Sequence, residues 1–114
     1  MNERFEISIL LDLYKELLTD KQKNIMIMYY EEDFSLAEIA EINNTSRQAI
    51  HDLIKRCCKQ LMFYEEKLKL MEKLSVIEES KGKVIRELHE IIELDKDNVE
   101  KKILEIENLI VNGF

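Results

Sequence analysis

The residues of this sequence best suited to chemistry are basic and amide side chains between Ser46 and Gln60. Arginine, lysine and glutamine side chains bind the phosphate oxygens and base edges of nucleic acids. The segment carries four basic side chains against one acidic side chain, Asp52, for a local charge of +3, whereas the whole chain has a net charge of −7. We therefore expect any nucleic-acid contact here, and the candidate residues are Arg47, Gln48, His51, Lys55, Arg56 and Lys59.

These candidates divide into two roles. Arg47 and Gln48 suit bidentate hydrogen bonds to base edges. The cations that follow, Lys55, Arg56 and Lys59, suit neutralisation of phosphates. The competing interpretation is that all of them are ordinary solvated residues on a helix surface, which the acidic composition favours. Both interpretations stay open at the level of sequence.

The same search finds no pattern typical of an enzyme or a metal site. Cys57 and Cys58 are adjacent, so a disulfide between them would be strained. Neither His51 nor His89 has a cysteine or histidine at a spacing suited to zinc. The chain also lacks a glycine-rich phosphate loop and a nucleophile elbow. We predict reduced thiols, no metal, no cofactor and no enzymatic activity.

The candidate residues need a scaffold that holds the start of a helix outward, and the segment from Phe34 to Ile54 has the spacing of one. Two helices that cross steeply need a small residue where they approach, a turn residue, and an apolar contact in the second helix. These positions are filled by Ala40, Asn44 and Ile50, with Leu53 as the next contact. The pattern predicts a helix-turn-helix whose second helix carries the basic segment and directs its positive dipole end toward phosphates.

Composition favours helices along the rest of the chain. The 114 residues include no proline and two glycines, and 46% are apolar and 36% charged, a mixture typical of amphipathic helices. Capping boxes at Thr19–Gln22 and Ser35–Glu38 mark two helix starts. We expect an all-α fold with helices over residues 3–18, 20–30 and 36–42, and a fourth helix that starts at Arg47.

The fourth helix is predicted to be long, because the sequence has no stop signal before Glu78. We place a hinge at Glu78–Gly82, a break at Asp95–Asn98, and a last helix capped by Asp97 with Glu100. A heptad seam on the long helix allows packing within one chain or between two. Its residues are Ile54, Cys57, Leu61, Tyr64, Leu68 and Met71.

This pattern suggests two regions. Residues 1–74 form the helix-turn-helix domain, including the long helix. Residues 75–114 form a C-terminal helical extension that packs on this core or on a second copy of the chain.

Four motifs taken together resemble a known family. They are LTDKQ at residues 18–22, EDFSLAEIA at 32–40, SRQAI at 46–50 and YEEKL at 64–68. These segments are similar to the YlxM family, which itself resembles region 4 of bacterial sigma factors, and the resemblance covers residues 3–74. It implies a sigma region 4-like helical bundle with a helix-turn-helix. It also implies a regulatory or accessory role in the signal recognition particle pathway, since genes of the family lie beside those of the particle.

The remaining expectations concern location and partners. No apolar run approaches the length of a membrane span, and the N-terminus lacks the pattern of a signal peptide, so we expect a cytoplasmic protein without membrane contact. A complete sigma factor is not expected, because the chain has no second module rich in aromatic and basic residues to hold single-stranded DNA. The predicted partner is duplex DNA or signal recognition particle RNA. The alternative is an adaptor that binds particle protein or RNA without duplex DNA, and a homodimer is a further expectation.

Overall fold

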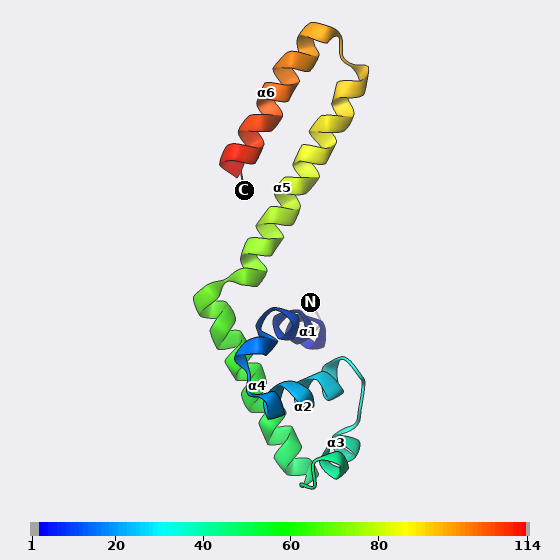
Figure 1. The fold of residues 1–114 in the computed structure, drawn as a ribbon, viewed down its shortest axis with the longest axis vertical. Coiled ribbons are helices and arrows are strands. Elements are labelled where there is room, and N and C mark those ends of the chain that lie inside the picture. The colour runs from blue at the N-terminus through cyan, green and yellow to red at the C-terminus, as the bar shows by residue number, and fades with distance from the viewer. Residues whose placement is uncertain (1–2, 114) are drawn as a thin grey trace. The chain divides into compact units, whose positions relative to one another are not determined.

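The computed structural model describes residues 3–113, which form helices joined by short turns, with no strand in this range (Figure 1). The predicted all-α class is therefore confirmed. None of the described helices has the length and apolar character needed to cross a bilayer. The elements are α1 (Glu3–Tyr14), η1 (Lys15–Leu17), α2 (Asp20–Tyr30), α3 (Leu36–Ile42), α4 (Arg47–Leu68), α5 (Leu70–Glu90), η2 (Ile91–Glu93) and α6 (Lys96–Gly113).

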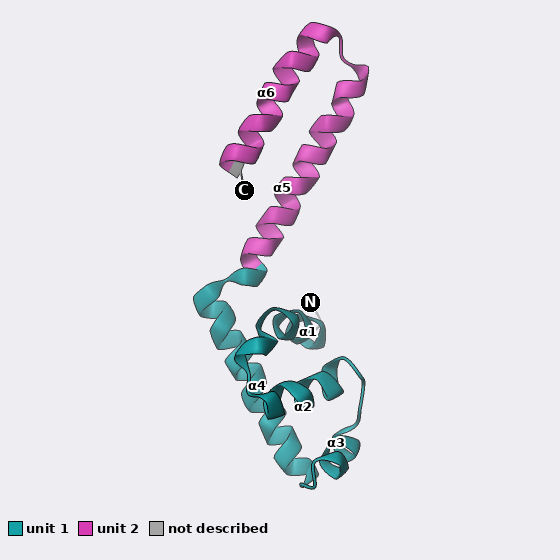
Figure 2. Ribbon diagram, viewed as in Figure 1, with its two compact units in different colours: residues 1–71 teal, residues 72–114 magenta. Residues whose placement is uncertain are grey.

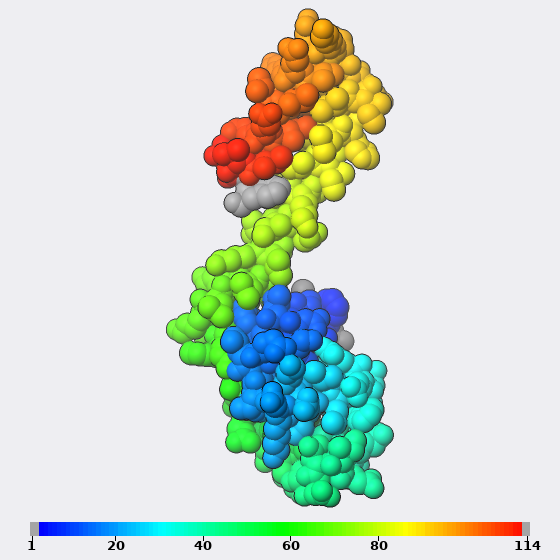
Figure 3. Space-filling view, viewed as in Figure 1, coloured from blue at the N-terminus to red at the C-terminus, as the bar shows by residue number. Residues whose placement is uncertain are grey.

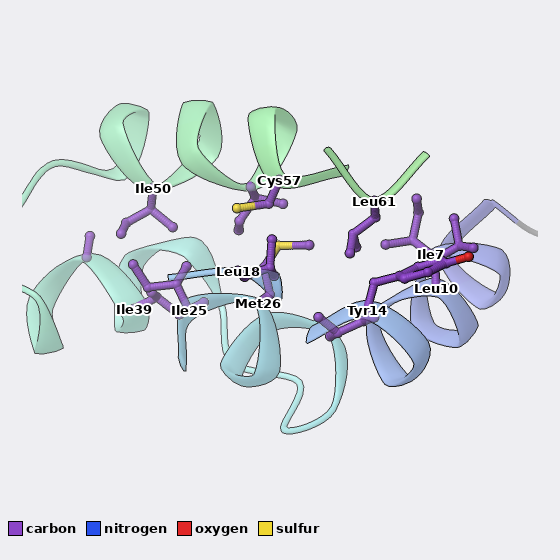
Figure 4. Close-up of a cluster of buried hydrophobic side chains, with 13 residues drawn as sticks. Ile7, Leu10, Tyr14, Leu18, Ile25, Met26, Ile39, Ile50, Cys57 and Leu61 are labelled. Carbon is purple, nitrogen blue, oxygen red and sulfur yellow. The ribbon is translucent and has the colours of Figure 1, made fainter. Parts of the chain in front are cut away.

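The chain divides into two compact units, residues 1–71 and residues 72–114 (Figure 2). In the first unit, α1, α2 and α3 all contact α4 (Figure 1). The space-filling view shows these segments packed against one another (Figure 3). Side chains from all four helices meet in one apolar core (Figure 4). Its buried members are Ile7, Leu10, Leu11, Tyr14, Leu18, Ile25, Met26, Ile39, Ala40, Ile50, Ile54, Cys57 and Leu61.

Both predicted capping boxes are present. The Thr19 hydroxyl accepts from the Gln22 backbone N–H at 3.2 Å, and the Gln22 side chain accepts from the Thr19 N–H at 3.0 Å. The Ser35 and Glu38 pair makes the same two bonds, at 3.1 and 3.0 Å. The hydrogen bond from the Ser35 backbone N–H holds the pKa of the Glu38 carboxyl below its usual range. Each box satisfies two backbone N–H groups with side chains only three residues apart. This short range is why the starts of α2 and α3 could be predicted.

The first helix is shorter than predicted. It was expected to reach Leu18, but α1 ends at Tyr14 and a single 3₁₀ turn follows. Leu18 then adopts an extended backbone and is buried in the core. The apolar pattern through Leu18 thus reflects burial in the core and not a continuous helix, because an extended residue can bury its side chain as well as a helical one.

The long helix is also interrupted where no stop was predicted. α4 ends at Leu68, Lys69 has a left-handed backbone with a φ of 56°, and α5 begins at Leu70. The first part of the heptad seam is buried within the chain at Ile54, Cys57 and Leu61, whereas Leu68 is exposed. The seam therefore packs within unit 1: its first three positions are buried, Tyr64 and Met71 are partly buried against the same core, and Leu68 is the exception.

A buried tyrosine from α1 holds this interruption in place. The Tyr14 hydroxyl donates to Glu65 Oε1 at 2.7 Å and accepts from the Leu70 backbone N–H at 3.1 Å. The same Glu65 oxygen accepts from the Met71 N–H at 3.0 Å. Burial, followed by the hydrogen bond to Glu65, raises the pKa of Tyr14, so this hydroxyl keeps its proton. Two N–H groups at the start of α5 are thus satisfied by side chains, which offsets the left-handed residue between the helices.

The second unit is a hairpin of α5 and α6, shown in magenta in Figure 2. Lys102 of α6 forms ion pairs with Glu87 and Glu90 of α5, so the two helices lie side by side. The hinge predicted at Glu78–Gly82 was wrong, since α5 is continuous through it. One glycine inside a helix costs only about 1 kcal/mol, which the flanking helix-forming residues outweigh.

The break before the last helix lies close to its predicted place, but its cap was assigned wrongly. Asp95, not Asp97, caps α6, because its Oδ1 accepts from the Asn98 backbone N–H at 2.9 Å. The α6 helix already begins at Lys96, which places Asp97 inside its first turn. The turn before α6 is shorter than the sequence suggested, because the three residues Ile91–Glu93 before it form the 3₁₀ turn η2.

The junction between α4 and α5 gives the first prediction. Tyr14→Phe removes the hydroxyl that serves both Glu65 and Leu70, and we expect it to lower the free energy of unfolding by about 1–3 kcal/mol, because the partly buried Leu70 N–H loses its acceptor and Glu65 loses a donor. Urea denaturation followed by circular dichroism measures this change. The matched control is Tyr29→Phe, which keeps the ring over which Arg4 lies. Equal stability of the two variants would contradict the role assigned to Tyr14.

Candidate nucleic-acid interface

The turn between α3 and α4 begins where helix-forming residues give way to asparagines. Asn44 adopts a left-handed backbone, with a φ of 52°. Its N–H donates to Glu41 O at 3.3 Å, and the Thr45 N–H reaches back to Ala40 O at 3.0 Å. These two bonds form a Schellman motif, which satisfies the carbonyl groups at the end of a helix and reverses the chain. Asparagine tolerates this conformation better than most residues with a side chain, so the turn forms without glycine.

The second helix starts at the residue predicted. Ser46 is extended, and its hydroxyl accepts from the Ala49 N–H at 3.0 Å, so α4 begins at Arg47. Ala40 and Ile50 are both buried where α3 and α4 pack, and Leu53 is partly buried. Figure 4 shows Ile50 pointing from α4 toward Ile39 of α3. A small side chain, a left-handed turn and an apolar contact therefore occupy the positions that a helix-turn-helix needs.

All six candidate residues are on the solvent side of α4. Polar residues share one stripe of the helix, because they recur at steps of four, three and four residues. In chain order they are Gln48, Asp52, Lys55 and Lys59. The core residues Ile50, Ile54, Cys57 and Leu61 occupy the opposite side. The structure thus leaves the exposed set free to meet a ligand: Arg47, Gln48, His51, Lys55, Arg56 and Lys59.

Three of the six candidates are brought together at a shallow, open depression at the start of α4. Its volume is about 530 Å³. Arg47, Gln48 and His51 line it, and the remaining cations lie further along the helix, outside it. Leu36 and Ser46 complete the lining. Neither residue was among the candidates predicted from the sequence, although Ser46, as the cap of α4, must lie at the exposed start of that helix.

Asp52 has a larger part in this surface than the sequence suggested. Its Oδ1 accepts from Gln48 Nε2 at 2.9 Å and lies 3.6 Å from His51 Nδ1. The carboxylate therefore holds one N–H of the Gln48 amide, and the second N–H and Oε1 remain as further hydrogen-bonding groups of that side chain. The spacing of four residues on one helix was the signal for this contact.

The paired cysteines lie behind the interface and not in it. Both are free thiols, and burial raises the pKa of Cys57 to about 11. Burial also raises the pKa of Cys58, which shares a 3.2 Å hydrogen bond with the Tyr30 hydroxyl. These thiols stay protonated near neutral pH and act as apolar packing between α2 and α4.

This arrangement of α3, turn and α4 defines the class of the protein as a helix-turn-helix protein. Residues 1–107 match the family model UPF0122, described as "Putative helix-turn-helix protein, YlxM / p13 like". The chain belongs to the UPF0122 family, which confirms the resemblance predicted from its motifs.

Relatives of similar length carry the same family name. The chain is 56% identical over 111 residues to a UPF0122 protein of Clostridium perfringens, an alignment that covers 95% of this chain and 99% of the relative. It is 50% identical over 114 residues to one from Clostridium kluyveri, with both chains covered completely. A UPF0122 protein of Clostridium botulinum is 66% identical over 73 residues, covering 64% of this chain and 67% of the relative.

The left-handed turn residue gives the second prediction. Asn44→Val is expected to lower the free energy of unfolding by about 1–2 kcal/mol, because a β-branched side chain is strained at positive φ. Asn44→Gly should leave stability unchanged or raise it slightly, since glycine adopts this conformation without strain. Thermal or urea unfolding measures both.

A matched control separates backbone strain from the general effect of valine. Asn24 is exposed within α2, so Asn24→Val makes the same substitution at a helical position. If Asn44→Val were no more destabilising than Asn24→Val, the turn would not depend on the left-handed residue.

Proposed function

We propose that this protein is a nucleic-acid-binding regulator that reads its target with the first half of α4. The observation that carries the proposal is the joint exposure of Arg47, Gln48 and His51 at the outward start of a helix held by a helix-turn-helix. A helix presented in this way enters the major groove of a duplex with its N-terminal residues against base edges. The family description supports the same role at the coarser level of a helix-turn-helix protein, and it names no reaction.

The roles of the residues follow from their places on the helix. Arg47 and Gln48 lie in the first turn, where side chains reach base edges. Lys55, Arg56 and Lys59 lie two and three turns further on, where they contact phosphates on either side of the groove. Asp52 works against phosphate binding and orients Gln48, so it favours selectivity over affinity. Because the chain as a whole is acidic, binding depends on this local cluster and not on a general positive charge.

The third prediction tests this interface directly. Replacing Arg47, Gln48 and Lys55 together with alanine is expected to weaken binding by about a hundred-fold or more, because each base or phosphate contact contributes about 1–3 kcal/mol. Mobility-shift titrations with duplex DNA and with signal recognition particle RNA measure the loss. Circular dichroism should be unchanged, because all three side chains are exposed.

A control variant and a salt series make this test specific. Lys83→Ala with Lys101→Ala removes the same number of cations from exposed positions in unit 2 and should bind like the wild type. The slope of log K against log salt is about −0.9 for each phosphate neutralised on duplex DNA and about −0.7 on single strands. The triple variant should therefore show a shallower slope on the true ligand. Binding that survives the triple substitution would show that α4 is not the reading helix.

A second function is supported by the charge of the neighbouring helix. Exposed acidic residues surround the start and outer face of α3, where a duplex backbone would approach a helix-turn-helix. Carboxylates there repel phosphates and suit a basic protein surface. Together with the YlxM resemblance, this supports an accessory protein of the signal recognition particle that contacts particle protein or RNA. The acidic residues are Glu31, Glu32, Asp33, Glu38 and Glu41.

The fourth prediction separates this adaptor from a DNA-binding regulator. If the adaptor role holds, a pull-down with the full chain after nuclease treatment should recover signal recognition particle protein. Glu38→Gln with Glu41→Gln should lower that recovery while preserving the capping box, because glutamine also caps at this position. The matched control is Glu78→Gln with Glu79→Gln on α5, which should not lower it. Failure to recover particle protein after nuclease treatment, or recovery of DNA alone from an untreated lysate, would count against the adaptor.

A further inference from the structure

The hairpin of α5 and α6 leaves most of its large apolar side chains in solvent. Among the described side chains of residues 72–112, Ile106 is the only one that is fully buried. Ile92 is 82% exposed and Ile85 is 54% exposed. Two helices alone bury little apolar surface, and so many exposed aliphatic residues indicate an interaction surface. The exposed set is Leu74, Val76, Ile85, Leu88, Ile92, Leu94, Ile103, Leu104, Ile110 and Val111.

The exposure along each helix follows one rule. Residues that face the other helix of the hairpin are at least partly buried, and the residue after each of them is exposed. On α5 and η2, Val84 and Ile91 are partly buried, and Ile85 and Ile92 follow them. On α6, the pairs are Lys102 with Ile103, Ile106 with Glu107, and Leu109 with Ile110.

The residues that follow the buried positions lie on one side of the hairpin, on both helices. One step along a helix turns the side chain by about 100° in a fixed sense relative to the direction of the chain. Because α5 and α6 run in opposite directions, these rotations bring the following residues to the same side. They form a face, which we call the hairpin face, composed of Lys81, Ile85, Leu88, Ile92, Ile103, Glu107 and Ile110.

We propose that the hairpin face pairs with the same face of a second copy of this chain, so that two hairpins form a four-helix bundle. In this arrangement the apolar side of each helix packs against two neighbours: the other helix of its own hairpin and one helix of the second copy. Helices of four-helix bundles have apolar sides of this width. A two-fold axis parallel to the helices sets α5 of one copy against α6 of the other, antiparallel and at matching levels.

The charges on the hairpin face favour a second copy as its occupant. Lys102 lies level with Glu87 and Glu90, which sets the register of the hairpin. In that register Lys81 stands within about one turn of Glu107 along the axis. A two-fold axis parallel to the helices leaves the height of each residue along the axis unchanged. Lys81 of each copy therefore lies near the height of Glu107 of the other copy and pairs with it. The face is therefore self-complementary in charge as well as apolar.

The fifth prediction concerns the oligomeric state of the nuclease-treated full chain, measured by sedimentation velocity. We expect a dimer at micromolar concentration. Leu88→Asp should raise the dissociation constant by roughly a hundred-fold or more, because it would bury an unpaired charge. Leu104→Asp makes the same change at an exposed leucine outside the hairpin face, on the side of α6 that points away from α5, and should leave the dimer intact.

Exchange of charges keeps the test decisive if Leu88→Asp fails to fold. Lys81→Glu alone and Glu107→Lys alone should each weaken the homodimer, since each sets like charges against one another. A mixture of the two should form a heterodimer, because both pairs are then opposite in charge. Lys83→Glu, on the opposite side of α5, serves as the control and should dimerise like the wild type.

Three outcomes would overturn the proposal. A wild-type chain that stays monomeric at all concentrations shows that the hairpin face does not pair with a second copy. A Leu88→Asp dimer as tight as the wild type shows that the dimer uses another surface. A mixture of the two charge variants that fails to pair shows that the two-fold arrangement is wrong. Because nucleic acid is removed, none of these results depends on the function of α4.

Discussion

The contact on which the interface depends is the packing of α3 against α4 at Ala40 and Ile50. Both side chains are buried, and alanine lets the two backbones approach closely. The angle between the helices is fixed by this contact together with the left-handed Asn44 and the cap at Ser46. As α4 lies with its apolar side on the core, its basic side must face solvent. Exposure of the candidate residues is thus a consequence of core packing rather than of any interaction that they make themselves.

A second constraint, made by polar groups, fixes where α4 ends. The Tyr14 hydroxyl and the Glu65 carboxylate satisfy two N–H groups at the start of α5, which allows the chain to turn at Lys69. This small network ties α1 to the far end of α4. The helix that carries the candidate interface is therefore held at both ends, at one end by the Schellman turn and Ser46, and at the other end by a side chain from α1.

The two helices of the helix-turn-helix differ in the sign of their surface charge. The outward face of α4 is basic, whereas α3 and the turn before it are acidic. Under the proposed nucleic-acid-binding function, an acidic chain with one basic stripe would discriminate among polyanions, because only a ligand that avoids α3 can use the stripe fully. Asp52 lowers the positive charge within the stripe, and its hydrogen bond to Gln48 orients that amide.

The sequence alone determined those features that rest on neighbours along the chain. Capping boxes at Thr19 and Ser35, the turn at Asn44 and the start of α4 at Arg47 each involve groups only a few residues apart, so residue type and spacing suffice. The same spacing indicated which side chains of α4 would be exposed. Only the tertiary structure decided where α1 and α4 end, because Leu18 joins a core made by other helices and Tyr14 reaches Glu65 from a distant part of the sequence. Gly82, which in isolation suggests a hinge, lies inside a continuous helix for a related reason: a local preference of about 1 kcal/mol is smaller than the stabilisation from the helix around it.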